Sequence, residues 1–134
     1  LDLSQCDAVT NQGINKLTKR CINLENLDLS YRWGNIGDIS ISALPHLLSL
    51  DLSGCSDMRN SSIMLLAKGC PNLKSLNLNS CLNLDSSSVV ATAEGCCDLN
   101  TLGLQGCSLV EDASVITLAE RCPKLKSLDL SGCV

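Results

Sequence analysis

The chain lacks most of the residues that build an aromatic core or a catalytic centre. Phenylalanine is absent, and Tyr31 and Trp33 are the only aromatic residues among 134. Leucine must therefore supply the buried surface. His46 is the only histidine and lies in the turn Leu44-Pro45-His46-Leu47, where an exposed turn residue is the better interpretation. There is no G-x-S-x-G, P-loop or G-x-G-x-x-G motif, so we expect no enzyme and no cofactor.

Excess positive charge is also lacking. Ten lysines and arginines stand against 14 aspartates and glutamates, a net charge of −4, which argues against nucleic acid or an anionic membrane surface as the main partner. No apolar run approaches the roughly 20 residues of a membrane helix, and no basic-then-apolar leader is visible. We expect an intracellular protein, cytoplasmic or nuclear, with a protein partner.

The feature that is present throughout is a repeat. The segment Leu-x-Leu begins at Leu1, Leu27, Leu50, Leu76, Leu102 and Leu128, at intervals of 26, 23, 26, 26 and 26 residues. A fixed period in this range indicates a solenoid, and the leucine-rich signature L-x-x-L-x-L-x-x-N/C recurs in register. We therefore predict a single array over residues 1–134, with a partial last repeat at 128, as an internal piece of a longer array.

Each repeat combines two periodicities. Around Leu76 and Leu78 the pattern alternates with period 2, which predicts a short strand with leucines inward and Ser75 and Asn77 outward. A helical spacing of i, i+3, i+4, i+7 follows; its members are Ile14, Leu17, Thr18 and Cys21, then Ile63, Leu66, Ala67 and Cys70, then Val89, Thr92, Ala93 and Cys96, then Val115, Leu118, Ala119 and Cys122. The predicted N-cap residues are Asn11, Asn60, Ser86 and Asp112.

The fold class that follows is an α/β leucine-rich-repeat solenoid, or horseshoe, with parallel strands on its concave face and helices on its convex face. The second repeat departs from the period: it lacks four residues before Leu47 and gains one before Asp38. Four residues make about one helical turn, so the pattern predicts a shortened helix and a local change of curvature there.

These residues resemble the cysteine-containing subfamily of leucine-rich repeats, whose pattern is legible from Cys96-Cys97-Asp98-Leu99 through Leu118-Ala119. The resemblance implies substrate-recognition repeats of an F-box-type ubiquitin-ligase receptor, with the ligase adaptor bound only through a region absent from this chain. It also implies an alternative, a structural or assembly subunit of a large intracellular complex such as a ciliary or cytoskeletal assembly. A regulatory protein without an F-box lies between the two.

Nine of the ten cysteines occupy two repeating positions, and Cys97 falls outside both. The strand-end cysteines are Cys6, Cys55, Cys81, Cys107 and Cys133, and the helix-end cysteines are Cys21, Cys70, Cys96 and Cys122. We interpret both sets as structural: small thiols that pack in the interior and donate weakly to turn carbonyls. Stacked side chains point the same way, which argues against disulfides, and ligands spaced by whole repeats argue against a zinc site.

A partner is expected on the outward side of the strands. The central row there is Asp2, Asp28, Asp51, Asn77, Gly103 and Asp129, and the flanking row is Ser4, Ser30, Ser53, Asn79, Gln105 and Ser131. The predicted partner-binding residues within these rows are Asp28, Asp51, Asn77, Asn79 and Gln105. Like charges stacked on neighbouring strands cost some stability, so the aspartates could be kept for a basic partner. The opposing interpretation is that Leu-Asp-Leu-Ser is the usual strand sequence in this family.

Tyr31, Arg32 and Trp33 form the second candidate site. They follow the second predicted strand and replace the two-residue segment, any residue and then cysteine, that follows the strand in the other repeats. They also bring both aromatic residues beside an arginine. Tyr, Trp and Arg are enriched at binding hot spots. The alternative is that Trp33 fills space left by the shortened helix, and the two interpretations are left open at this point.

Overall fold

The computed structural model describes residues 1–32, 41 and 44–133. Within these residues, four helices and five strands follow one another in the order α1(Asn11–Arg20), β1(Asn26–Asp28), β2(Ser49–Asp51), α2(Asn60–Gly69), β3(Ser75–Asn77), α3(Ser86–Gly95), β4(Thr101–Gly103), α4(Asp112–Arg121) and β5(Ser127–Asp129). None of the described helices has the length and apolar character needed to cross a membrane.

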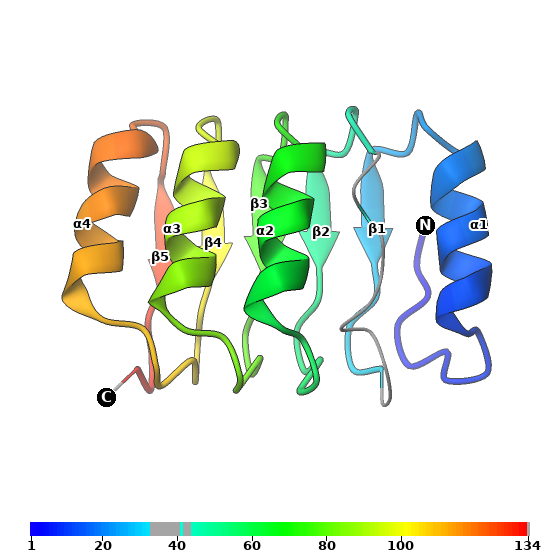
Figure 1. Cartoon of the computed structure of the whole chain (residues 1–134), viewed down its shortest axis with the longest axis horizontal. Helices are drawn as coiled ribbons and strands as arrows, with labels where there is room; N and C mark the ends of the chain where they lie inside the picture. Colours follow the sequence, from blue (N-terminus) through cyan, green and yellow to red (C-terminus); the bar gives the residue numbers. More distant parts are fainter. Residues whose placement is uncertain (33–40, 42–43, 134) are drawn as a thin grey trace.

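The strands form one parallel sheet in the order β1-β2-β3-β4-β5. Leu27, Leu50, Leu76, Leu102 and Leu128 are register partners along it, so each strand lies one repeat further along the chain. Helices α2, α3 and α4 cover one face of this sheet (Figure 1). The predicted fold class, an α/β repeat solenoid with parallel strands and helices on the opposite side, is confirmed.

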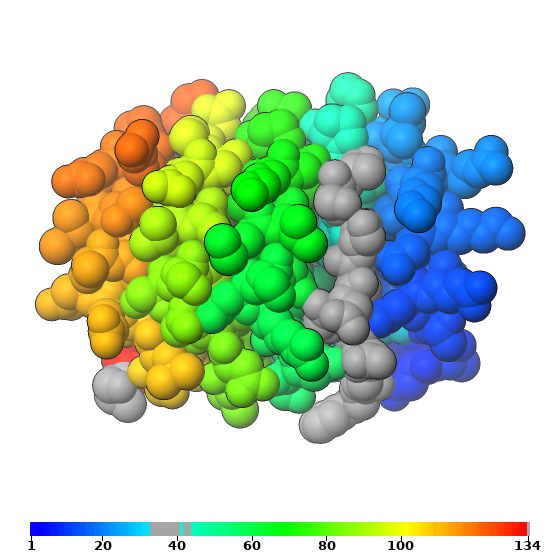
Figure 2. Space-filling view, viewed as in Figure 1, coloured from blue at the N-terminus to red at the C-terminus, as the bar shows by residue number. Residues whose placement is uncertain are grey.

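The core lies between the sheet and the helices. Leu76 in β3 and Leu78 just after it are fully buried, in one core cluster with helix residues such as Ile63 and Val89. Neighbouring helices pack on one another, α2 on α3 and α3 on α4, and the space-filling view shows the chain laid out in bands in sequence order (Figure 2). One repeat could not bury its leucines alone, so burial comes from stacking.

The predicted N-cap residues are wrong by one position. The caps are Thr10, Arg59, Asp85 and Glu111, and the predicted residues are the first residues of the helices. Two of the predicted residues bridge repeats instead: Asn60 Oδ1 accepts the backbone N–H of Asp85, and Ser86 Oγ accepts that of Glu111. The sequence pattern located a polar residue at the helix start, but stacking decides which amide it meets.

A row of buried serines was not predicted. Ser62, Ser88 and Ser114 recur at intervals of 26 residues and are buried at the helix starts. Ser88 Oγ donates to the carbonyl of Asp85 at 2.8 Å, and Ser114 Oγ to that of Glu111 at 2.7 Å. The repeated residue type at one interval was the signal that could have found them.

The shortened helix predicted in the second repeat falls largely outside the described residues. Asp38 and Trp33 belong to that part of the chain. Ile41 and Leu44, which are described, are both buried in the core.

Candidate functional site

The side of the sheet that faces away from the helices, called the open sheet face below, carries the central and flanking rows. Asp28, Asp51, Asn77, Gly103 and Asp129 are register partners on successive strands. Asp2 joins the row through a parallel bridge to Asp28. The structure therefore aligns these positions into one line, as the repeat predicted.

Most members of the central row have a structural role that their spacing alone did not reveal. Asp51 Oδ1 accepts both the backbone N–H of Ser53 at 2.8 Å and its hydroxyl at 2.6 Å. The equivalent acceptor–donor pairs are Asp2 with Ser4, Asp28 with Ser30, Asn77 with Asn79, and Asp129 with Ser131. Such local bonds favour a turn. The recurring Leu-Asp-Leu-Ser thus closes the turn after each strand.

The same bonds affect the acids electrostatically. Hydrogen bonds from the Ser131 hydroxyl and backbone N–H lower the pKa of Asp129, and those from Ser4 lower the pKa of Asp2. Donors that favour the ionised form hold these carboxylates charged. Asp129 Oδ1 accepts both the backbone N–H and the hydroxyl of Ser131, so Asp129 keeps a negative charge on the open sheet face.

Gly103 interrupts the row and changes the local bonding. It has no side chain to accept the N–H of Gln105, and Asn79 Oδ1 from the preceding repeat accepts it at 2.8 Å instead. A Cβ atom on Gly103 would lie 2.6 Å from Asn79 Oδ1 and 2.8 Å from Asn77 Oδ1. Two amide oxygens therefore converge where the other strands carry a side chain.

Around Gly103 the open sheet face is hollowed, with a volume of about 310 Å³. Among the described residues, the lining is Ser49, Leu50, Asp51, Ser75, Leu76, Asn77, Asn79, Thr101, Leu102, Gly103, Ser127 and Asp129. It contains two carboxylates and no basic side chain. We call this feature the Gly103 hollow. A second hollow of about 360 Å³ lies at the other end of the face, against Asp2, Asp28 and Asp51.

The structure separates the residues of the second candidate site. Tyr31 is 52% exposed and Arg32 is 5% exposed, while Trp33 lies outside the described residues. Arg32 follows Leu27 by five residues, as Cys55 follows Leu50, so it takes the place of a strand-end cysteine. Its guanidinium donates to the carbonyl of Val9. A buried guanidinium is not available to a partner, which corrects the prediction of a binding role for Arg32.

Tyr31 contributes both packing and exposed surface. It adopts a left-handed backbone conformation with φ 52°, at a position where three other repeats have Gly54, Gly106 and Gly132 and two have Gln5 and Ser80. The Tyr31 ring lies against Gly54, since a Cβ there would meet the ring carbons. The remaining exposed part of the ring is accessible at the edge of the sheet.

The strand-end cysteines donate to the repeat before them. The Sγ–O distances are 3.3 Å from Cys55 to Leu29, 3.2 Å from Cys81 to Leu52, 3.4 Å from Cys107 to Leu78 and 3.2 Å from Cys133 to Leu104. The helix-end thiols behave similarly, with Cys70 donating to Ile41 at 3.5 Å and Cys96 to Cys70 at 3.5 Å. Each thiol thus links two repeats.

The predicted burial of the thiols is found at Cys55, Cys70, Cys81, Cys96, Cys107 and Cys122. Cys6 and Cys21 are exposed, and Cys133 is half-buried. The prediction of interior packing is wrong for Cys6 and Cys21, because no earlier repeat of this chain packs against them. Desolvation raises the pKa of the Cys55 and Cys70 thiols to about 11, which keeps them neutral. No three His, Cys, Asp or Glu residues are grouped as metal ligands in the described chain.

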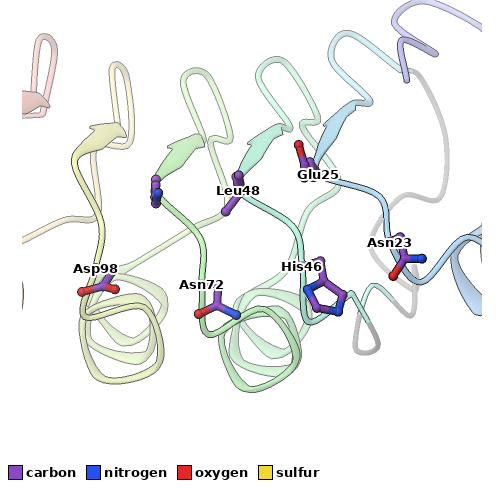
Figure 3. A pocket seen from close by; sticks show the side chains of 7 residues that line it. Asn23, Glu25, His46, Leu48, Asn72 and Asp98 are labelled. Carbon is purple, nitrogen blue, oxygen red and sulfur yellow. The ribbon is translucent and has the colours of Figure 1, made fainter.

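A further hollow of about 480 Å³ lies where the chain leads into successive strands (Figure 3). Its lining is Asn23, Glu25, His46, Leu48, Asn72, Lys74 and Asp98. Two of its polar groups are already engaged: Asn72 Nδ2 donates to the Pro45 carbonyl at 2.7 Å, and Asp98 pairs with Lys124 at 2.6 Å. His46 is exposed, in agreement with its prediction as a turn residue. Sequence reasoning missed Glu25 and Lys74, which the repeat places at equivalent positions.

No protein-family model matches the chain, and no curated protein matches it by sequence. Sixteen chains of solved structures match it. One belongs to the crystal structure of the Rad7 and Elc1 complex in yeast, with 23% identity and a TM-score of 0.66. The match covers 91% of this chain and 36% of that chain, so this chain spans about a third of its structural neighbour. The likeness shows the fold, a repeat solenoid of alternating strands and helices.

Proposed function

We propose that the chain is a protein–protein interaction scaffold, without enzymatic activity, and that the open sheet face contacts the partner. The observation that carries the proposal is the in-register line of polar side chains on β1, β2, β3 and β5, with Gly103 on β4. The strand leucines are committed to the core, so the outward side chains lie at the surface of a rigid sheet. Such a surface suits recognition of another protein.

For the finer role we propose the substrate-recognition repeats of an F-box-type ubiquitin-ligase receptor, located inside the cell. The resemblance to cysteine-containing repeats and the fold of a chain in a yeast protein complex support this role. The alternative is a structural or assembly subunit of a large complex. In both roles the partner is a protein, and the aspartates of the central row favour a basic one.

The test is affinity purification of the full-length protein from its native source, with bound proteins identified by mass spectrometry. A photo-crosslinking amino acid at Thr101, exposed on β4, reports contacts of the open sheet face. The matched control places it at Ile116, exposed on α4.

Recovery of a ligase adaptor and cullin, with a second protein crosslinked at Thr101, supports the substrate-receptor role. Stoichiometric cytoskeletal or other assembly subunits without adaptor or cullin support the alternative. Crosslinks found only at Ile116 contradict the assignment of the open sheet face.

A further inference from the structure

The Gly103 hollow has a defined length. It runs across β2, β3, β4 and β5, with Asp51 at one end and Asp129 at the other. Neighbouring strands lie about 4.8 Å apart, so three spacings separate the two aspartates by about 14 Å. Asn77 and Gly103 occupy the register positions between them.

Its chemistry favours positive charge. Asn77 Oδ1 and Asn79 Oδ1 both face Gly103, and the amide nitrogen of Asn77 is engaged with Asp51 Oδ2 at 2.9 Å. Asp129 Oδ1 is held by Ser131. Acceptor oxygens and two carboxylates therefore line a hollow whose described lining includes no lysine or arginine. An ammonium or guanidinium group complements this surface, whereas a carboxylate is repelled.

We propose that the open sheet face binds an extended partner segment that runs across the strands and carries two lysine or arginine side chains four residues apart. An extended chain advances about 3.3 Å per residue, so four residues span about 13 Å, close to the separation of Asp51 and Asp129. Side chains at i and i+4 also point to the same side. This inference rests on the proposed protein-binding function.

The test measures binding of fluorescein-labelled peptides to the full-length protein by fluorescence anisotropy. The probe is a Gly/Ser decapeptide with arginines at i and i+4. The comparison peptides carry arginines at i and i+1, glutamines at i and i+4, or glutamates at i and i+4. Since a solvent-accessible ion pair contributes up to about 1 kcal/mol, roughly a five-fold change in Kd, the i, i+4 arginine peptide should bind about five-fold more tightly than the i, i+1 peptide.

The protein variants isolate the charge from the fold. Asp129→Asn retains an Oδ1 acceptor for Ser131, so the turn is kept while the charge is lost; it should weaken the i, i+4 arginine peptide by about three- to five-fold. Asp112→Asn removes one carboxylate from the exposed start of α4, on the helix side of the sheet, and should leave Kd unchanged. Gly103→Thr fills the hollow and should weaken binding without a change of charge, with thermal unfolding recorded for each variant.

Equal Kd values for the two arginine spacings, an unchanged Kd for Asp129→Asn, or equally tight binding of the glutamate peptide would overturn the inference. These results would leave the scaffold function intact if Thr101 still crosslinks a native partner. Crosslinking only at Ile116 would instead contradict the proposed binding face, whatever the peptides show.

Discussion

At the scale of single residues, the recurring cysteines are explained by the space that one repeat leaves beside its predecessor. Cys81 is fully buried, and its thiol donates to the carbonyl of Leu52 one repeat earlier. A small side chain with a weak donor suits this position because it fills little volume and still satisfies part of a turn carbonyl. Arg32 is the exception to this use of a small side chain. Its long side chain is buried at the same position, and its guanidinium donates to the carbonyl of Val9.

The buried thiols make the fold sensitive to alkaline pH. Burial raises the pKa of Cys55 and Cys107 to about 11 and that of Cys96 to about 12, from an ordinary value of 9.0. The neutral thiol is favoured in the folded state, so its stabilisation is complete below pH 9 and is lost as the pH rises through the folded pKa values. We expect the urea midpoint, measured in reductant, to fall between pH 9 and 11.

A Cys96→Ala variant provides the control, because it removes one of these titrations. Its urea midpoint should fall less steeply with pH than that of the unchanged protein. A midpoint that does not change from pH 8 to 11 would contradict the role of the buried thiols.

At the scale of single elements, the helices share a length of ten residues but begin differently. Among the four described helices, only α3 has a side-chain cap, in which Asp85 Oδ1 accepts the N–H of Ser87 at 2.8 Å. The Ser87 hydroxyl and backbone N–H also lower the pKa of Asp85. The starts of α1, α2 and α4 have no side-chain cap bond.

Replacing Asp85 by alanine should therefore lower the free energy of unfolding by about 1 kcal/mol, the usual cost of losing a cap. The matched control is Glu111→Ala at the cap of α4, where the side chain makes no cap bond, and it should have little effect. Urea denaturation of both variants checks the difference; equal losses would show that the cap bond is not what stabilises α3.

Two helical glycines should respond in opposite ways to alanine. Gly95 packs against α2 so closely that a Cβ would overlap the carbonyl oxygen of Ala67, and Gly95→Ala should destabilise the protein by about 1–3 kcal/mol. Gly13 in α1 is exposed, and its nearest contact is Val9 Cγ1 at 3.6 Å. Gly13→Ala should stabilise by about 0.5–1 kcal/mol.

Thermal unfolding of the two glycine variants gives the measurement. The same sign of change in both would contradict the close approach of α3 to α2. A loss of stability in Gly95→Ala together with a gain in Gly13→Ala would confirm that the packing of α3 on α2, and not helix propensity, determines the effect at Gly95.

At the scale of the whole molecule, stability depends on the position of a repeat within the stack. Leu76 in β3 is fully buried between neighbouring repeats, whereas its equivalent Leu128 in β5 is half-buried. Leu76→Ala should cost about 2–5 kcal/mol, as for other buried leucines, and Leu128→Ala clearly less. Chemical denaturation of this 134-residue chain measures both, and equal costs would contradict a core built by stacking.

The repeat fixed much of the fold in advance because its chemistry is local. The alternation around Leu76 and the helical spacing from Ile63 require only a strand and a helix in each period, and the common register of the leucines then follows from stacking. The central row of the candidate site was predictable for the same reason. What the period could not supply was the bond that each outward side chain makes with its neighbours.

The sequence by itself thus determined the solenoid, the parallel register and the outward rows, since a fixed period repeats one local solution along the chain. The tertiary structure decided the rest: that Asp85 rather than Ser86 caps α3, that Arg32 is buried, and that Asn79 replaces the missing side chain of Gly103. The last two depend on an atom about one repeat away: Arg32 reaches the carbonyl of Val9, and Asn79 Oδ1 accepts the N–H of Gln105. Distance along the chain hides such contacts, and only stacking brings them together.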